Sequence, residues 1–157
     1  MKVVPLPAGS PTPVRHDIAD REDVDVLVRS FYRLAAQDDL LGPVFAAAGV
    51  DWPSHIDRLT DFWCWQLLGQ AGYGRNPLRA HASAHARTPF SPAHHQRWES
   101  LFCDTVDEHF AGPVADAAKV RGLKMSRALA RLLDGASAPG DEPVRQVEAV
   151  LSRRPSA

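Results

Sequence analysis

Four of the seven histidines in this 157-residue chain lie in one short stretch, residues 77–98. His81 and His85 are one helical turn apart, and His94 and His95 follow a proline-containing break. Two imidazoles at positions i and i+4 can chelate one metal ion from a helix face. The stretch contains no carboxylate or cysteine to complete a tetrahedral site, and the chain has neither a His-Glu-x-x-His nor a Glu-x-x-His motif. The spacing alone therefore leaves two readings open: a divalent-metal site or solvated histidines.

Aromatic residues form the second group of candidates, and most of them are expected to be core. Tyr32 and Trp98 differ from the phenylalanines because a hydroxyl and an indole N–H need a hydrogen-bond partner when they are buried. An apolar cavity with these two polar atoms pointing inward would suit a flat apolar cofactor that binds a small polar ligand.

Helices must position these residues, because no β-branched run alternates at period two and apolar residues recur at threes and fours. The first helix is predicted to begin at Asp20, a good N-cap residue, and to be ended by Gly42-Pro43. Its apolar face is expected to contain Val24, Leu27, Val28, Phe31 and Leu34.

Three further main helices and one short helix follow from similar signals. Ser54 is predicted to cap the second helix, and a short helix over residues 78–87 would carry His81 and His85 on one side. Ser91-Pro92 starts the next helix, and a last helix with Val120 on its apolar face runs from Gly112-Pro113 to Gly135. The chain is therefore predicted to be all-α.

Composition bounds the domain organisation and the class of protein. The ends are rich in Pro, Gly and Ser, so residues 1–17 are predicted to be a disordered extension, 18–134 one domain and 135–157 a flexible tail. A net charge of −1 and a pI of about 6.6 offer no basic surface for nucleic acid or an anionic membrane. No apolar run approaches the ~20 residues of a membrane span. Two cysteines without a disulfide framework favour the cytoplasm.

Four segments together resemble a known family. They are "FYRLAAQDDLLGPVF", "WPSHIDRLTDFW", "YGRNPLRAH" and "RWESLFCDTVDEHFAGPVADAAKVR", and they occur in this order. In this order and at this spacing they resemble the truncated haemoglobins, most closely those of group III, from about residue 18 to residue 133. The resemblance implies a truncated globin fold, a two-over-two helical sandwich around haem b (iron protoporphyrin IX).

The resemblance also implies roles for individual residues. His81 matches the proximal ligand of the haem iron, and His85, on the same helix face, is the alternative ligand. Tyr32, Trp98 and His55 match residues on the distal side that stabilise a bound ligand. The implied haem-pocket residues are Phe31, Phe45, Leu59, Phe62, Trp63, Leu78, Phe90, Phe102 and Met125. The candidate partners of the haem propionates are Arg75, Arg79, His85 and Arg121.

The function implied by the resemblance is reversible binding of dioxygen, and of NO and CO, at ferrous haem iron. A hydrogen bond to a charged group contributes roughly 1.5–3 kcal/mol, so distal donors predict a tight oxygen holder. Oxygen handling and NO or peroxide detoxification are the implied roles. Turnover would need a partner reductase, because the sequence shows no flavin or nicotinamide domain. The alternatives are a metal-binding helical module built on His81 and His85, and a cofactor-free helical interaction domain.

Overall fold

The computed structural model describes residues 13–74 and 77–135, without the side chains of residues 77–80 and 135. This part of the chain contains six α-helices and no β-strand, which confirms the all-α prediction. The helices are α1 (Arg21–Gln37), α2 (Gly42–Ala48), α3 (Trp52–Leu68), α4 (Pro77–Arg87), α5 (Pro92–His109) and α6 (Pro113–Gly135). Most of the predicted extension and tail falls outside the described residues.

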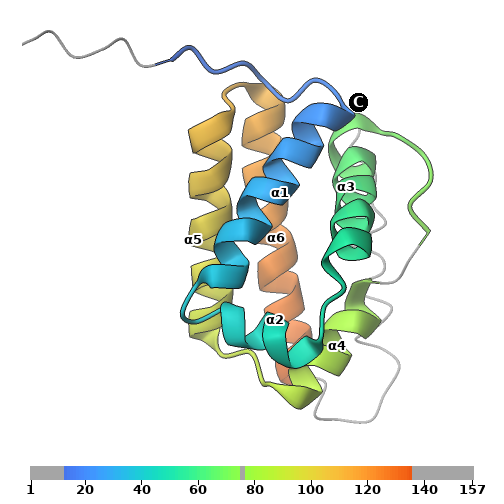
Figure 1. Ribbon diagram of the computed structural model, residues 1–157, viewed down its shortest axis with the longest axis vertical. Helices are drawn as coiled ribbons and strands as arrows, with labels where there is room; N and C mark the ends of the chain where they lie inside the picture. The colour runs from blue at the N-terminus through green and yellow to red at the C-terminus, as the bar shows by residue number, and fades with distance from the viewer. Residues whose placement is uncertain (1–12, 75–76, 136–157) are drawn as a thin grey trace, which may run out of the picture.

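Two helix pairs form the body of the molecule (Figure 1). Helix α1 packs against α3, α5 packs against α6, and α1 and α5 join the two pairs. The short helices α2 and α4 contact each other at one end of the molecule, where α3 begins. This is the two-over-two arrangement that the sequence predicts.

The first helix begins where its capping signal indicates. The Asp20 carboxylate accepts a hydrogen bond from the backbone N–H of Asp23 at 3.0 Å. The side chains that α1 buries are Val24, Leu27, Val28, Phe31, Tyr32 and Ala35. The placement of Leu34 and Val120 on apolar faces is wrong, because they are 43% and 51% exposed. On α1, Ala35 continues the buried face four residues after Phe31.

The corner between α1 and α3 differs from the prediction. Helix α1 ends at Gln37, and Gly42-Pro43 begins the unpredicted α2, with Pro43 in the first turn, where its missing N–H costs nothing. A Cβ at Gly42 would lie 2.7 Å from the carbonyl oxygen of Ala36, so α2 approaches α1 closely there. Helix α3 begins at Trp52, which places Ser54 inside the helix and not at its cap.

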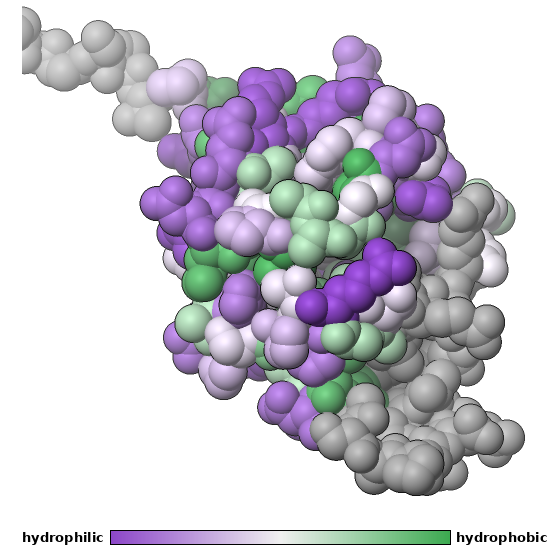
Figure 2. All heavy atoms as spheres, turned by 60° about the horizontal axis from the view of Figure 1, so that its bottom comes forward, coloured by the Kyte–Doolittle hydropathy of each residue, from purple (hydrophilic) through white to green (hydrophobic). Residues whose placement is uncertain are grey.

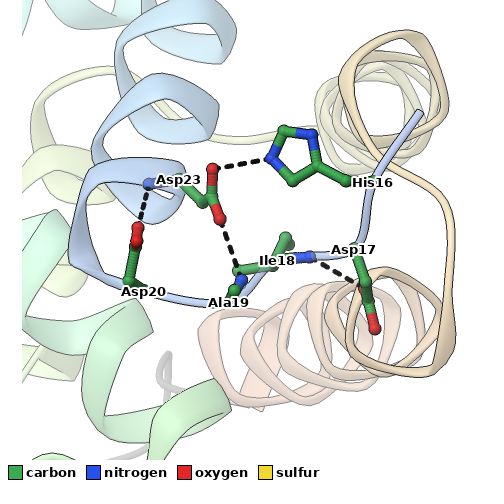
Figure 3. A network of polar contacts seen from close by, with 6 residues as sticks. All are labelled: His16, Asp17, Ile18, Ala19, Asp20 and Asp23. Atoms are coloured by element: carbon green, nitrogen blue, oxygen red, sulfur yellow. Dashed lines mark hydrogen bonds and ion pairs between the residues drawn. The ribbon is translucent and has the colours of Figure 1, made fainter. Parts of the chain in front are cut away.

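Figure 3 shows the polar network just before α1, in which the Asp17 carboxylate accepts the backbone N–H of Ile18 at 2.9 Å. The same carboxylate fixes this segment to α6. The Asp17 carboxylate accepts hydrogen bonds from the backbone N–H groups of Val114 at 2.9 Å and Ala115 at 2.8 Å, at the beginning of α6. Partial burial acts to raise the pKa of Asp17, but these bonds and one from Ile18 outweigh it and lower the pKa. Asp17 therefore caps a helix that is nearly a hundred residues away in sequence.

Candidate distal and proximal residues of a haem site

Tyr32 is the centre of an aromatic group formed by three helices. It lies on α1 and is 8% exposed. Its ring meets the imidazole of His55, on α3, edge-on with the ring centres 5.6 Å apart. Phe45, on α2, and Trp52, at the start of α3, lie 5.9 and 6.2 Å away by the same measure. Residues distant in sequence thus surround one phenol.

Trp98, on α5, forms a hydrogen bond with Tyr32. An indole N–H can only donate, so the Tyr32 oxygen accepts this bond and the phenolic proton stays available to another acceptor. Burial raises the pKa of Tyr32, and the bond from Trp98 offsets this shift only in part, so the phenol stays protonated. Phe31 contacts both rings edge-on, at 4.7 Å from Tyr32 and 5.3 Å from Trp98.

His55 is a half-buried imidazole beside Tyr32. Burial, the positive charge of Arg58 and the nearby His81 together lower the pKa of His55 to about 4. The ring is therefore neutral near pH 7 and offers one donor and one acceptor.

His81 lies on α4 and is exposed to solvent. His81 also acts to lower the pKa of His55, although the two imidazoles belong to different helices. Within the described residues, no Cα atom of α4 approaches one of α3 within 8 Å. The backbones of α3 and α4 therefore do not pack closely.

His85, one turn further along α4, has a different environment. Its Nδ1 atom accepts a hydrogen bond from the backbone N–H of Phe90 at 2.9 Å, and its ring meets the Phe90 ring edge-on at 5.3 Å. In a neutral imidazole that accepts at Nδ1, the proton is on Nε2. Neither nitrogen then has a lone pair free for a metal ion.

The last two histidines of the stretch belong to the start of α5. His94 Nδ1 accepts the backbone N–H of Ser91 at 2.9 Å, and the Ser91 side chain accepts the backbone N–H of His94, so the two residues form a capping box. His95 packs against Phe90, and burial lowers its pKa. In the described part of the chain, no group of three His, Cys, Asp or Glu side chains could hold a metal ion.

The structure brings some of the predicted pocket residues together and separates others. Phe31, Phe45, Trp63 and Phe102 all belong to the connected set of rings around Tyr32 and Trp98. Phe62 joins the same set through Trp63, with the ring centres 5.5 Å apart, and it also contacts Trp65 and Tyr73.

The remaining predicted pocket and propionate residues lie away from this set of rings or outside the residues that the structure describes. Phe90 lies at the junction of α4 and α5, and Leu59 and Met125 are half-buried against the core. Of the propionate candidates, Arg121 donates to the side-chain oxygen of Gln66 at 3.0 Å. Arg75 and the side chains of Leu78 and Arg79 lie outside the described residues.

Two residues that the sequence did not single out belong to this region. Trp52 contacts both Tyr32 and His55, and its position three residues before His55 on one helix was the available signal. Arg58 acts electrostatically on His55 from the next turn of α3.

Figure 2 shows the end of the molecule that carries α2 and α4. On the part of this face drawn in colour, hydrophobic residues form small groups among hydrophilic ones. No described helix has the length and apolar character that crossing a membrane requires.

Two helix pairs, joined to a short α4 that bears an exposed histidine, define a truncated globin fold. A scan against models of protein families found no match. The chain is similar to a group 3 truncated haemoglobin of Campylobacter jejuni, with 26% identity over 98 residues that cover 60% of this chain and 75% of that protein. The crystal structure of a group III truncated haemoglobin from Campylobacter jejuni superimposes with a TM-score of 0.67 and 23% identity, covering 76% of this chain and 95% of that one. The resemblance to group III truncated haemoglobins that the sequence shows is therefore confirmed.

Proposed function

We propose that this chain is a haem-binding globin that reversibly binds dioxygen and other diatomic ligands. The observation that carries the proposal is the aromatic group that surrounds the buried Tyr32 phenol on α1, α2 and α3, together with its relation to α4. His81, on α4, acts to lower the pKa of His55, although the backbones of α3 and α4 do not meet. The similarity to truncated haemoglobins supports the same function.

The donor set fits haem chemistry. An exposed imidazole on one helix can ligate iron, and a neutral imidazole and a phenol on the facing elements can hydrogen-bond to a ligand. When bound, haem b supplies the ferrous iron at which a diatomic ligand is held. Among the described residues, Phe45, His55 and Trp52 would contact its distal face, and the cationic Arg58 suits a propionate partner.

His81 is proposed as the proximal ligand, and His85 is disfavoured. The Nδ1 atom of His85 already accepts the Phe90 N–H, whereas an iron ligand must give up one lone pair and donate from its other nitrogen. His85 instead stabilises the end of α4.

On the distal side, Tyr32 is proposed as the principal donor. Its oxygen accepts from Trp98, which polarises the phenol and leaves its proton to point at the ligand. His55 is available as a second, neutral donor. Carbon monoxide develops less charge than dioxygen on binding, so it gains less from these donors.

Oxygen handling is the physiological role that this site favours. Turnover with NO or peroxide would draw electrons from a reductase that is not part of this site. A cytoplasmic location, expected from the free thiols of Cys64 and Cys103, stays a prediction.

Titration of the purified protein with haemin tests the proposal. We expect saturation near one haemin per chain and a Soret band that shifts when the reduced protein takes up CO or dioxygen. A protein that stays colourless in haemin would sink the proposal. If this colourless protein bound zinc tightly, and the His81→Ala variant did not, the chain would instead be a metal-binding helical module.

A further inference from the structure

Gly122 occupies an unusual position in the middle of α6, a helix of 23 residues. Glycine is among the poorest helix formers, and its φ here is not in the left-handed region that would require it. The reason for a glycine at this position must therefore be a close approach of other atoms.

Phe102 supplies that close approach. A Cβ atom on Gly122 would lie 2.8 Å from both Cδ1 and Cε1 of the Phe102 ring and 3.5 Å from Cζ3 of Trp98. Carbon atoms in contact are normally about 3.5–4.0 Å apart, so the Phe102 ring would have to move.

The Phe102 ring has little freedom to move without its neighbours. It is stacked between Trp63, with ring centres 5.0 Å apart, and Trp98, with ring centres 4.9 Å apart. Phe31 meets its edge at 5.3 Å, and the side chain is 2% exposed. Three rings therefore form one stack, Trp63–Phe102–Trp98, which rests on the backbone of α6 at Gly122.

Trp98, at one end of the stack, is the ring that connects the stack to the proposed ligand site. Its plane lies 10° from that of Phe102, and its indole N–H is the donor to Tyr32. A shift of the stack would therefore move the N–H that polarises the Tyr32 phenol.

We propose that Gly122 is a positioning residue: it seats the Trp63–Phe102–Trp98 stack so that Trp98 holds Tyr32, and it thereby sets the preference of the site for dioxygen over carbon monoxide. The proposal rests on the proposed haem function for its effect on ligands. The seating of the stack itself is a property of the protein without haem.

The first test uses the apoprotein. The chain has four tryptophans, each with one indole N–H signal in a ¹⁵N-correlated NMR spectrum, and single Trp→Phe variants assign them. In Gly122→Ala we expect the signals of Trp63 and Trp98 to shift and those of Trp52 and Trp65 to stay in place. Unshifted Trp98 and Trp63 signals in a folded Gly122→Ala protein would overturn the proposal.

The second test uses the haem-loaded protein. Gly122→Ala should increase the rate of dioxygen dissociation about tenfold, and that of carbon monoxide much less, because only dioxygen depends strongly on the phenol. Gly112→Ala is the control: its Cβ would clash with Asp17, at the far junction, so it should lower stability without changing either rate. Equal increases for both gases in Gly122→Ala would contradict the proposed specificity.

Phe102→Leu keeps the proposal testable if Gly122→Ala does not fold. This variant removes the middle ring, so dioxygen dissociation should rise as in Gly122→Ala. The double variant should be no faster than Phe102→Leu alone, because both changes act on one stack. Rates that multiply would show that Gly122 acts elsewhere. If wild-type protein takes up no haemin, the proposed function fails, and the indole signals still decide the seating of the stack.

Discussion

The two sides of the proposed haem site are held very differently. On the distal side, Tyr32 is buried and connected to rings from four helices, α1, α2, α3 and α5. On the proximal side, none of residues 81–87 is fully buried, and α4 packs only against α2 and α6 within the described part of the chain. The donors to a ligand are thus fixed by the protein, whereas the proposed iron ligand stands on a less tightly held helix.

This difference has a physical consequence. A phenol fixed before the ligand arrives loses little side-chain entropy when it donates, so its hydrogen bond contributes nearly in full. Helix α4 has few buried contacts, so binding of the proposed haem through His81 would supply order that packing does not.

Replacing the central distal donor should have the largest effect on ligands. Tyr32→Phe keeps the ring and its contacts but removes the hydroxyl. Loss of a bond of roughly 1.5–3 kcal/mol predicts dioxygen dissociation about 10–150 times faster, measured by stopped-flow displacement. Carbon monoxide dissociation should change much less. Equal changes for both ligands would mean that Tyr32 acts through packing.

The proximal helix should show the contrast in its dynamics. In the apoprotein, amides of α4 should exchange with deuterium at least about tenfold faster than those of α1 and α5. Haemin should slow exchange in α4 and leave α1 nearly unchanged. Fast exchange in α1 as well would indicate that the distal side is not preformed.

Replacing His85 with Gln should have a smaller effect, limited to amide exchange at the end of α4. The Gln side chain does not reproduce the acceptor for the Phe90 N–H in the same geometry, so the end of α4 should exchange faster. The visible spectrum of the haem-loaded protein should not change. A spectrum without the normal iron–histidine features would identify His85 as the ligand and overturn our assignment.

Asp17→Asn should leave both sides of the site unchanged while lowering stability. It removes one carboxylate oxygen that caps α6, a loss of about 1–2 kcal/mol in urea unfolding at pH 7. Because the folded-state pKa of Asp17 is lowered, its contribution is complete above the ordinary value of 3.8 and is lost as the pH falls through the lower one. The variant should therefore lose less stability than wild type on acidification, and a parallel pH dependence would rule out this role.

Much of this architecture could be predicted from the sequence, because local signals decided it. Asp20, Ser91-Pro92 and Gly112-Pro113 each mark a helix boundary through capping or proline geometry, and the structure has helices that begin there. The prediction failed at Gly42-Pro43. The sequence predicts only the end of one helix at this pair, although Pro is equally suited to the first turn of the next helix.

The site shows where local signals stop being sufficient. Trp98 could be recognised as a donor, but its partner could not, because Tyr32 comes from another helix and the bond depends on tertiary packing. Gly122 carries no signal in the sequence beyond being a glycine inside a helix. Its importance appears only once Phe102 is seen against it.

The identity of the iron ligand is the most direct test of the account. We would load His81→Gly with haemin and record its visible spectrum with and without added imidazole, beside wild type and His85→Gln. We expect His81→Gly to lose the ferrous five-coordinate spectrum and to regain it with imidazole, while His85→Gln matches wild type. A His81→Gly protein that keeps the wild-type spectrum without imidazole would contradict it.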